Sequence, residues 1–171
     1  LVGPVSLLLL SRATGGAEDT LIALPGLLRV YSELLTLVAE TGASAVQIDE
    51  PCLTGDLGER ELRAVELSWA TLATAAPQLE LTLATYFASL GDKLGRVLAL
   101  PFSELHLDLV RAPRQLDAAV ELIGEGRRLS LGLIDGRNVW AADLEAAARL
   151  AAPVIERLGS ERVRLAPSCS L

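Results

Sequence analysis

Short apolar runs that look like β-strands alternate with longer helical runs along almost the whole chain. This alternation is typical of repeated βαβ units, which form a parallel sheet covered by helices, and it argues against a sandwich or a helical bundle. The expected strands are Val2–Leu10, Ala45–Asp49, Leu79–Tyr86, Leu105–Val110, Leu129–Ile134 and Val163–Ala166. The expected helices are Leu24–Glu40, Glu59–Ala75, Asp92–Leu100, Pro113–Ile123 and Ala142–Leu158.

Proline and glycine mark where some of these helices should begin and end. Pro25 suits a first helical turn, and Gly42 is available as a left-handed stop for the same helix. Pro113 can open a helix in the same way. Pro153 lies late in the last helix and is expected to kink it or to end its first half early.

Strands separated by helices allow two architectures, an open doubly wound sheet or a closed eight-stranded α/β barrel. No Gly-x-Gly-x-x-Gly follows a strand and no Gly-Lys-Ser/Thr cradle occurs, so a nucleotide-binding fold loses support. The six strands are about three quarters of a TIM (β/α)8 barrel of roughly 250 residues. Because the chain opens on Leu1-Val2-Gly3-Pro4 and has no methionine, we expect residues 1–171 to form one partial barrel domain, strands three to eight, truncated on the amino-terminal side.

Composition excludes several classes of function. A net charge of −7, with dispersed basic residues, would repel a nucleic acid backbone. The longest uninterrupted apolar stretch, around Val5 to Leu10, is too short to span a bilayer and has no basic leader, so neither a membrane nor export is expected. Cys52 and Cys169 lie far apart, which favours reduced thiols and a cytoplasmic location.

In an α/β barrel the reactive face lies at the carboxyl ends of the strands, and here those ends are polar. The candidates for substrate binding are Asp49, Glu50, Tyr86, Arg137 and Asn138. Adjacent residues on a strand point to opposite faces, so only one of Asp49 and Glu50 can face the barrel mouth. Asp49 could hold a substrate amine or Glu50 could act as a base, but Pro51 after them equally suggests a structural turn.

Two further sets of residues have both a chemical and a structural interpretation. Arg137 and Asn138 could bind an anion, or Asp135 to Asn138 could form a capping and ion-paired turn. Trp69 and Trp140 have no aromatic neighbours in sequence, so we expect both to be packing residues.

Three residues form the only metal-like constellation in the chain. His106 and Asp108 lie two apart on one strand and share a face, and Cys169 follows the closing strand. Zinc accepts all three ligand types. A histidine beside a carboxylate is more often a hydrogen-bonded part of the barrel lining, so we expect no metal here.

Taken together, the motifs resemble one known family. They are Gly3-Pro4-Val5-Ser6, Val46-Gln47-Ile48-Asp49-Glu50-Pro51-Cys52-Leu53, Thr85-Tyr86-Phe87, Leu105-His106-Leu107-Asp108-Leu109-Val110, Gly132-Leu133-Ile134-Asp135-Gly136-Arg137-Asn138-Val139-Trp140 and Ala166-Pro167-Ser168-Cys169-Ser170-Leu171. Their order and their residues are similar to those of the amino-terminal barrel of cobalamin-independent methionine synthase. The resemblance covers almost the whole chain.

The resemblance implies part of a methyltransferase that carries a methyl group from 5-methyltetrahydrofolate polyglutamate to homocysteine in methionine biosynthesis. In that family two similar barrels share a cleft, and the zinc that activates the thiol lies in the carboxyl-terminal one. The catalytic barrel is expected to have His-x-Cys where this chain has His106-Leu107-Asp108, so no cofactor and no catalytic residue is expected in this segment. The resemblance also carries Asp49 over to the position that holds the homocysteine amine in the catalytic barrel.

Two hypotheses follow from the sequence. The first is an inactive barrel segment whose partner is the remainder of a longer chain that contains the catalytic barrel. The second is a stand-alone barrel enzyme, or metal-dependent methyltransferase, that uses His106, Asp108 and Cys169. The missing start residue favours the first.

Overall fold

The computed structural model describes residues 1–14 and 19–169, and it contains one parallel sheet. The strands are β1 (Ala45–Asp49), β2 (Glu80–Thr85), β3 (Glu104–Asp108), β4 (Arg128–Ile134) and β5 (Val163–Pro167). They lie in the sheet in the order in which they occur in the chain, and every pairing is parallel. The predicted sequential order is therefore confirmed, and it excludes a doubly wound sheet whose order reverses from a central strand.

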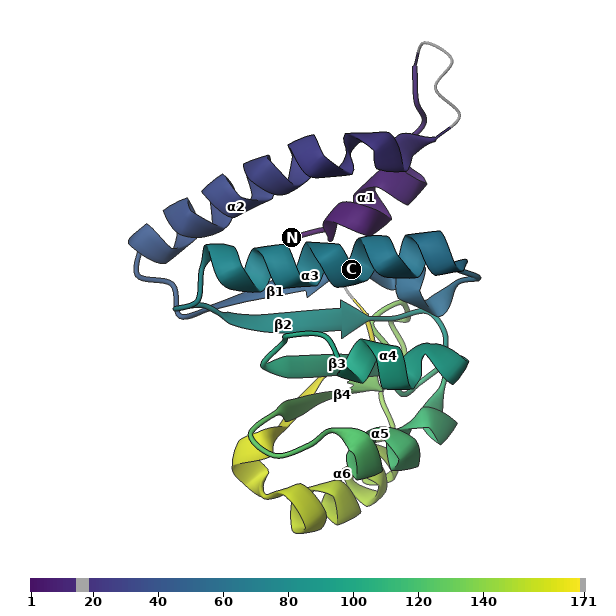
Figure 1. Cartoon of the computed structure of the whole chain (residues 1–171). Helices are drawn as coiled ribbons and strands as arrows, with labels where there is room; N and C mark the ends of the chain where they lie inside the picture. Colours follow the sequence, from purple (N-terminus) through teal and green to yellow (C-terminus); the bar gives the residue numbers. More distant parts are fainter. Residues whose placement is uncertain (15–18, 170–171) are drawn as a thin grey trace.

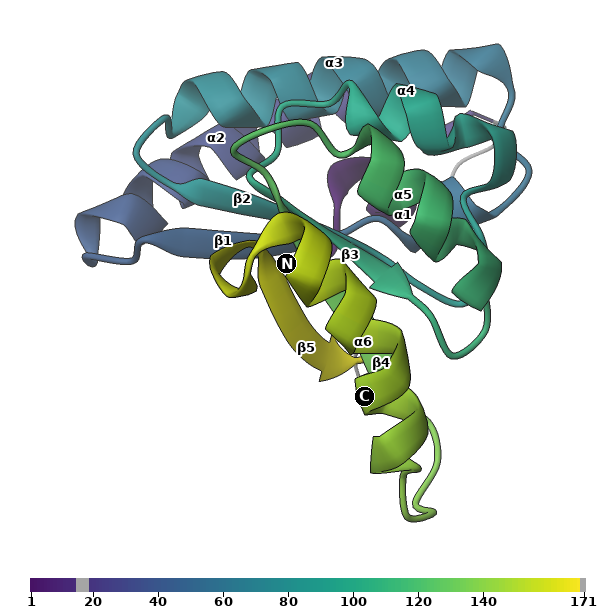
Figure 2. The same ribbon diagram turned by 90° about the horizontal axis from the view of Figure 1, so that it is seen from below.

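The helices lie along the sheet in the same sequence (Figure 1). They are α1 (Pro4–Leu10), α2 (Leu24–Glu40), α3 (Glu59–Ala75), α4 (Leu94–Leu98), α5 (Leu116–Leu122) and α6 (Leu144–Leu158). Single turns of 3-10 helix stand at Thr20–Ala23, Pro51–Thr54, Gly91–Lys93, Pro113–Gln115 and Ser160–Arg162. Helices α1 to α3 gather beside β1 and β2, and α6 lies at the β5 end of the sheet (Figures 1 and 2).

Helices α2 and α3 have the bounds that the sequence predicts. In α2 the buried residues Leu24, Leu28, Tyr31 and Leu35 recur at helical spacing, and Gly42 adopts the left-handed conformation with φ of +87°. The stretch Thr20–Glu40 contains an 18-residue window with a mean hydropathy of 1.6, and it is long and apolar enough, by length and composition alone, to cross a membrane. Core helices pass the same test, so one such helix is weak evidence for a membrane.

The predicted strand at Val2–Leu10 is wrong. Only Val2 pairs with the sheet, through an isolated parallel bridge to Asp49, and the chain then turns into α1. Pro4 stands in the first turn of this helix, where its missing N–H costs nothing. The backbone N–H groups of Val5 and Ser6, in the first turn of α1, donate to the carboxylate of Glu50. The residues around Pro4 alone give no sign of this distant acceptor.

Smaller differences concern the helices after α3. The expected helices at 92–100 and 113–123 each open with a 3-10 turn before a short α-helix. Helix α6 runs through Pro153 to Leu158 instead of ending early. Pro153 and Arg149 both lie on the exposed side of the helix. Because proline has no N–H, the carbonyl of Arg149, four positions earlier, loses its usual helical partner. Water can hydrate that carbonyl instead.

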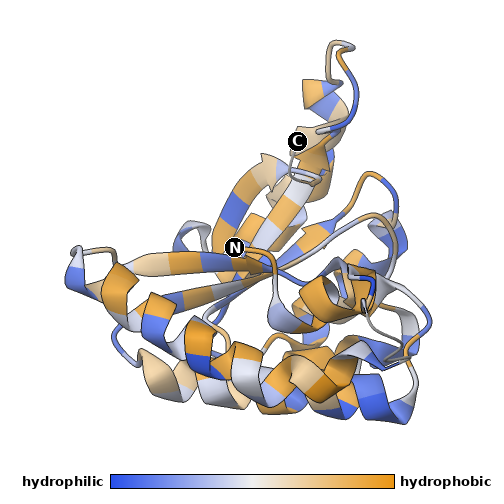
Figure 3. Cartoon of the chain, turned by 90° about the horizontal axis from the view of Figure 1, so that it is seen from above, coloured by the Kyte–Doolittle hydropathy of each residue, from blue (hydrophilic) through white to orange (hydrophobic). Residues whose placement is uncertain are grey.

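The two faces of the sheet differ in chemistry. Residues that point toward the helices are apolar, and the buried ones are Ile48, Leu81, Leu83, Leu105, Leu107, Leu129 and Leu131. Residues that alternate with them are polar or small, namely Gln47, Asp49, Glu80, Thr82, Ala84, Glu104, His106, Asp108, Arg128, Ser130, Gly132, Arg164 and Ala166. Figure 3 shows this alternation of colour along the strands. The pocket residues Gln47, His106 and Ser130 all belong to this polar face, so the candidate site lies there.

Candidate functional site at the strand ends

The predicted strand-end residues converge at the carboxyl edge of the sheet. Tyr86, His106 and Cys169 line one pocket of about 330 Å³ on the polar face. The hydroxyl of Tyr86 donates a hydrogen bond to Oδ2 of Asp49 at 2.9 Å, and Nε2 of Gln47 donates to Oδ1 at 2.7 Å. Parallel strands place their carboxyl ends together, which is why residues 37 positions apart in the chain meet here.

His106 is fixed from both sides of its ring. Its Nδ1 lies 2.9 Å from the Ser130 hydroxyl, and its Nε2 lies 3.2 Å from the carbonyl oxygen of Ser168. A carbonyl only accepts, so Nε2 carries the proton and Nδ1 accepts from Ser130. Burial lowers the pKa of His106, because desolvation outweighs the hydrogen bond to Ser168 and the nearby carboxylates. The ring is therefore a neutral part of the lining.

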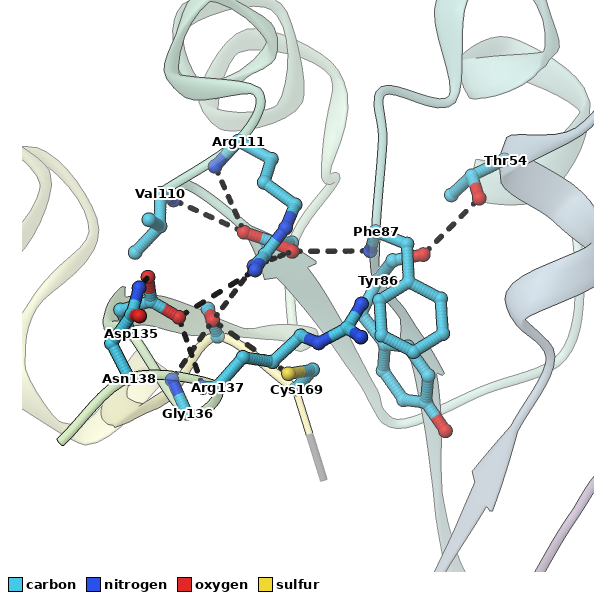
Figure 4. Close-up of polar contacts among 12 residues, drawn as sticks. Thr54, Tyr86, Phe87, Val110, Arg111, Asp135, Gly136, Arg137, Asn138 and Cys169 are labelled. Carbon is cyan, nitrogen blue, oxygen red and sulfur yellow. Dashed lines mark hydrogen bonds and ion pairs between the residues drawn. The ribbon is translucent and has the colours of Figure 1, made fainter. Parts of the chain in front are cut away.

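Asp108 and Arg111 form a clamp over the ends of three strands. Figure 4 shows Arg111 at the strand ends, near Asp135. The fully buried Asp108 carboxylate accepts the backbone N–H groups of Phe87, Val110 and Arg111. The guanidinium of Arg111 contacts Asp108 Oδ2 at 3.1 Å and Ser168 Oγ at 3.3 Å. It also lies 3.6 Å from Asp135, so one side chain joins the ends of β3, β4 and β5.

The segment after β4 forms a polar turn. Asp135 Oδ1 accepts the backbone N–H of Arg137 at 3.0 Å, and its Oδ2 accepts the side-chain amide of Asn138. These bonds match the expected capping turn, and the backbone bond lowers the pKa of Asp135. The Arg137 guanidinium stands over the Phe87 ring at 5.3 Å, as Figure 4 shows. Arg137 therefore reaches toward the site, whereas Asn138 serves the turn.

Glu50 lies on the other side of the strand from Asp49, as the alternation predicts. It is completely buried beneath α1, where its two carboxylate oxygens accept from Val5 at 3.2 Å and Ser6 at 2.8 Å. Desolvation raises the pKa of Glu50 despite these bonds. Gly3 allows the close approach, since a Cβ there would overlap the carboxyl group. The structure thus places Glu50 as a support for α1, away from the pocket.

The residues present do not fit zinc. Both ring nitrogens of His106 are engaged, and the Asp108 carboxylate is taken by backbone donors and Arg111. Within residues 1–14 and 19–169 no three His, Cys, Asp or Glu side chains come together as metal ligands would. A second thiolate is also missing from the set, because the Cys52 thiol lies beside Glu50 under α1. We therefore derive no metal chemistry from this segment.

Sequence reasoning missed three members of the site. Arg111 follows Asp108 by three positions, which was the available signal for an ion pair. Ser168 was noted only as part of a motif, although its hydroxyl joins Arg111 to the backbone N–H of Gly136. Phe87 has a φ of +83°, and no sequence pattern marks that conformation in a non-glycine residue. Ser170 and Leu171, which end the last motif, lie outside the described residues.

The fold and the strand-end site define a parallel α/β protein of the kind whose ligands meet the carboxyl edge of the sheet. Residues 1–159 match the family described as cobalamin-independent synthase, N-terminal domain, and the chain belongs to that family.

Three relatives that align over the whole chain carry the same name. A 5-methyltetrahydropteroyltriglutamate–homocysteine methyltransferase from Rhodopseudomonas palustris is 46% identical over 171 residues, and one from Caulobacter vibrioides is 47% identical. One from Chelativorans sp. is 49% identical over 172 residues. In each case the whole of this chain aligns, but it spans 22% of the relative's length.

Two solved structures share the fold. A B12-independent methionine synthase from Shewanella, solved in complex with selenomethionine, superposes with a TM-score of 0.76 at 14% identity, over 99% of this chain and 54% of that one. A putative vitamin-B12 independent methionine synthase from Listeria monocytogenes gives 0.67 at 16% identity, over 99% and 56%. At these identities the likeness concerns the fold alone.

Proposed function

We propose that this chain serves as an inactive supporting segment in a methyltransferase that moves a methyl group from 5-methyltetrahydropteroyltriglutamate to homocysteine. The observation that carries the proposal is the end-to-end alignment with enzymes of that name at 45 to 49% identity. The substrates, the reaction and the remainder of the enzyme as a partner come from those relatives. A cytoplasmic location stays a prediction.

The site supports a structural role for the segment within that enzyme. His106 is neutral and bonded on both sides, Asp108 is saturated by donors, and Glu50 is buried under α1. A general base needs a free lone pair aimed at substrate, a metal ligand needs one aimed at the metal ion, and these three groups offer neither. Zinc, which the family resemblance implies for the whole enzyme, is therefore expected outside these residues.

We further propose that the sheet is part of a TIM barrel. Sequential parallel order, helices over the apolar face and a polar face with converging strand ends all fit that architecture. Asp49 is a polar-face carboxylate bound by neutral donors, Tyr86 and Gln47, and it remains a substrate-facing candidate together with Tyr86 and Arg137.

The test compares the full-length protein containing this segment with the segment alone. Methyl transfer to homocysteine from the triglutamate folate should occur in the full-length protein and stay at background in the segment. Metal analysis after dialysis should find zinc in the full-length protein and none in the segment. One equivalent of zinc in the segment, lost in both His106→Ala and Cys169→Ser, would contradict the proposal and favour a stand-alone metal enzyme.

A further inference from the structure

Four charged side chains form a continuous row across the amino end of the polar face. They come from four neighbouring strands, β2 to β5, and they alternate in sign along their contacts. Arg128 contacts Glu80 on one side and Oε2 of Glu104, at 3.2 Å, on the other. Arg164 contacts the same oxygen of Glu104, also at 3.2 Å. These four residues, in the order Glu80, Arg128, Glu104 and Arg164, are here called the ion-pair row.

The row covers several strands with few residues because arginine side chains are long. Arg128 on β4 reaches over β3 to Glu80 on β2, which is two strand spacings of about 4.8 Å each. The Glu104 side chain is 2% exposed, so the two guanidinium groups that bind it also shield it from solvent. Its two cations and two anions balance, so the row needs no ion from solvent to neutralise it.

The pocket of the candidate site begins at this row and runs the length of the sheet. Ala45, Glu104 and Arg164 line it at the amino ends of their strands. Tyr86 and Cys169 line it just past the carboxyl ends. Glu104 and Arg164 therefore belong both to the ion-pair row and to the wall of the pocket.

The polar-face residues between the row and the strand ends are small or polar. The interior of an α/β barrel is usually filled by layers of branched apolar side chains, which make it a packed core. Small side chains fill less of that space, and hydroxyl and amide groups can bind water in it. The residues concerned are Gln47, Thr82, Ala84, His106, Ser130, Gly132 and Ala166. On these strands, the layer with side chains long enough to close the interior is the ion-pair row.

We propose that the ion-pair row is a barrier at the amino end of the barrel interior, so that water and small solutes enter the pocket from the strand ends. This inference rests on the barrel that is part of the proposed function, because only a closed barrel has an interior with two ends. Asp49 and Tyr86 then stand at the open end of the pocket, on the side from which a ligand arrives.

Thiol labelling of the full-length protein containing this segment tests the barrier. Ala166→Cys places a reporter thiol in the pocket, two positions beyond Arg164 on the same face of β5. Iodoacetamide, a small neutral reagent, is added, and tandem mass spectrometry quantifies the modification at position 166 separately from that at Cys169. Adding Arg164→Ala should speed labelling at position 166 about tenfold, because it opens a second route of entry. The rate at Cys169, on the strand-end side, should change by less than about twofold.

Two control variants separate the barrier from a general loss of stability. Arg96→Ala removes ion pairs to Glu59 and Glu66, which join α3 to α4 away from the polar face, and it should leave the rate at position 166 unchanged. Arg164→Lys keeps a long cation beside Glu104 and should restore most of the protection at position 166.

Three results would overturn the inference. An unchanged rate at position 166 in Arg164→Ala would show that the row blocks no route. Equal acceleration in Arg96→Ala would assign the effect to stability. With the row intact, labelling at position 166 as fast as at Leu122→Cys, a position 56% exposed on α5, would show that the interior is open.

Methyl transfer is assayed on unlabelled samples of the same proteins. If that activity is absent while Arg164→Ala still speeds labelling at position 166, the proposed function fails and the barrier stands. If methyl transfer occurs and the labelling rate does not respond to Arg164→Ala, the barrier fails and the proposed function stands.

Discussion

The hydroxyl of Tyr86 and the carboxylate of Asp49 meet at 2.9 Å across the ends of β2 and β1. Tyr86 is buried and Asp49 is partly buried, so the bond is sheltered from competing water. It ties two neighbouring strand ends on the polar face and orients the carboxylate that we propose as a substrate-facing group.

Tyr86→Phe should lower the free energy of unfolding by about 1 kcal/mol, because it removes one hydrogen bond and keeps the ring. Urea unfolding followed by circular dichroism measures the loss. The same change in an Asp49→Ala background should cost less than half as much, since the acceptor is already gone. An equal cost in both backgrounds would mean that the bond does not form.

Arg111→Ala should lower the free energy of unfolding by about 2 kcal/mol. The change leaves Asp108, which is fully buried, without its cation, although three backbone N–H groups still bind it. Arg114→Ala is the matched control, because Arg114 is exposed and should shift stability by less than about 0.5 kcal/mol. If both variants unfold at the same denaturant concentration, the clamp does not contribute to stability.

Two glycine substitutions should act in opposite directions. Gly3→Ala should destabilise the protein by about 2 kcal/mol, because a Cβ would overlap the Glu50 carboxyl group that supports α1. Gly26→Ala should stabilise it by about 0.5–1 kcal/mol, since Gly26 lies inside α2 with open space around it. Thermal melts compare the variants, and a neutral Gly3→Ala would show that α1 can shift away from Glu50.

The single histidine of the chain should make stability depend on pH. The pKa of His106 is lower in the folded state than its ordinary value of 6.5, so the unfolded state binds more protons below that pH. The contribution of His106 to the free energy of unfolding is thus complete above pH 6.5 and is lost as pH falls through its folded-state pKa. Its size is about 1.4 kcal/mol per unit of difference between the unfolded and folded pKa values.

His106→Gln should remove that part of the pH dependence. Unfolding free energies of the two proteins, measured from pH 7.5 to 5, should differ by an amount that shrinks with falling pH. Taking the difference cancels the opposite contribution of Glu50, whose raised pKa makes the folded state less stable as pH rises. A constant difference across this range would contradict a buried, neutral His106.

Periodicity in the sequence was sufficient for most of the fold. Helices α2 and α3 and strand β1 have the predicted bounds, because each carries a regular pattern of apolar residues bounded by proline, glycine or polar residues. The sequential strand order and the gathering of strand-end residues followed from the βαβ pattern, since parallel connections leave little choice of neighbours. The opposite placement of Asp49 and Glu50 followed from strand geometry alone.

Other features depended on contacts between residues far apart in the chain. A short run such as Pro4–Leu10 has the same apolar content as a buried strand or a buried helix, and the choice depends on the carboxylate of Glu50, more than forty positions away. Arg111 became a clamp because β4 and β5 bring Asp135 and Ser168 to it. Trp140 is exposed because the loop that carries it passes beyond the edge of the sheet, away from the packed core. Local sequence encodes which face of an element is apolar, whereas hydrogen bonds and exposure depend on which elements the fold places beside it.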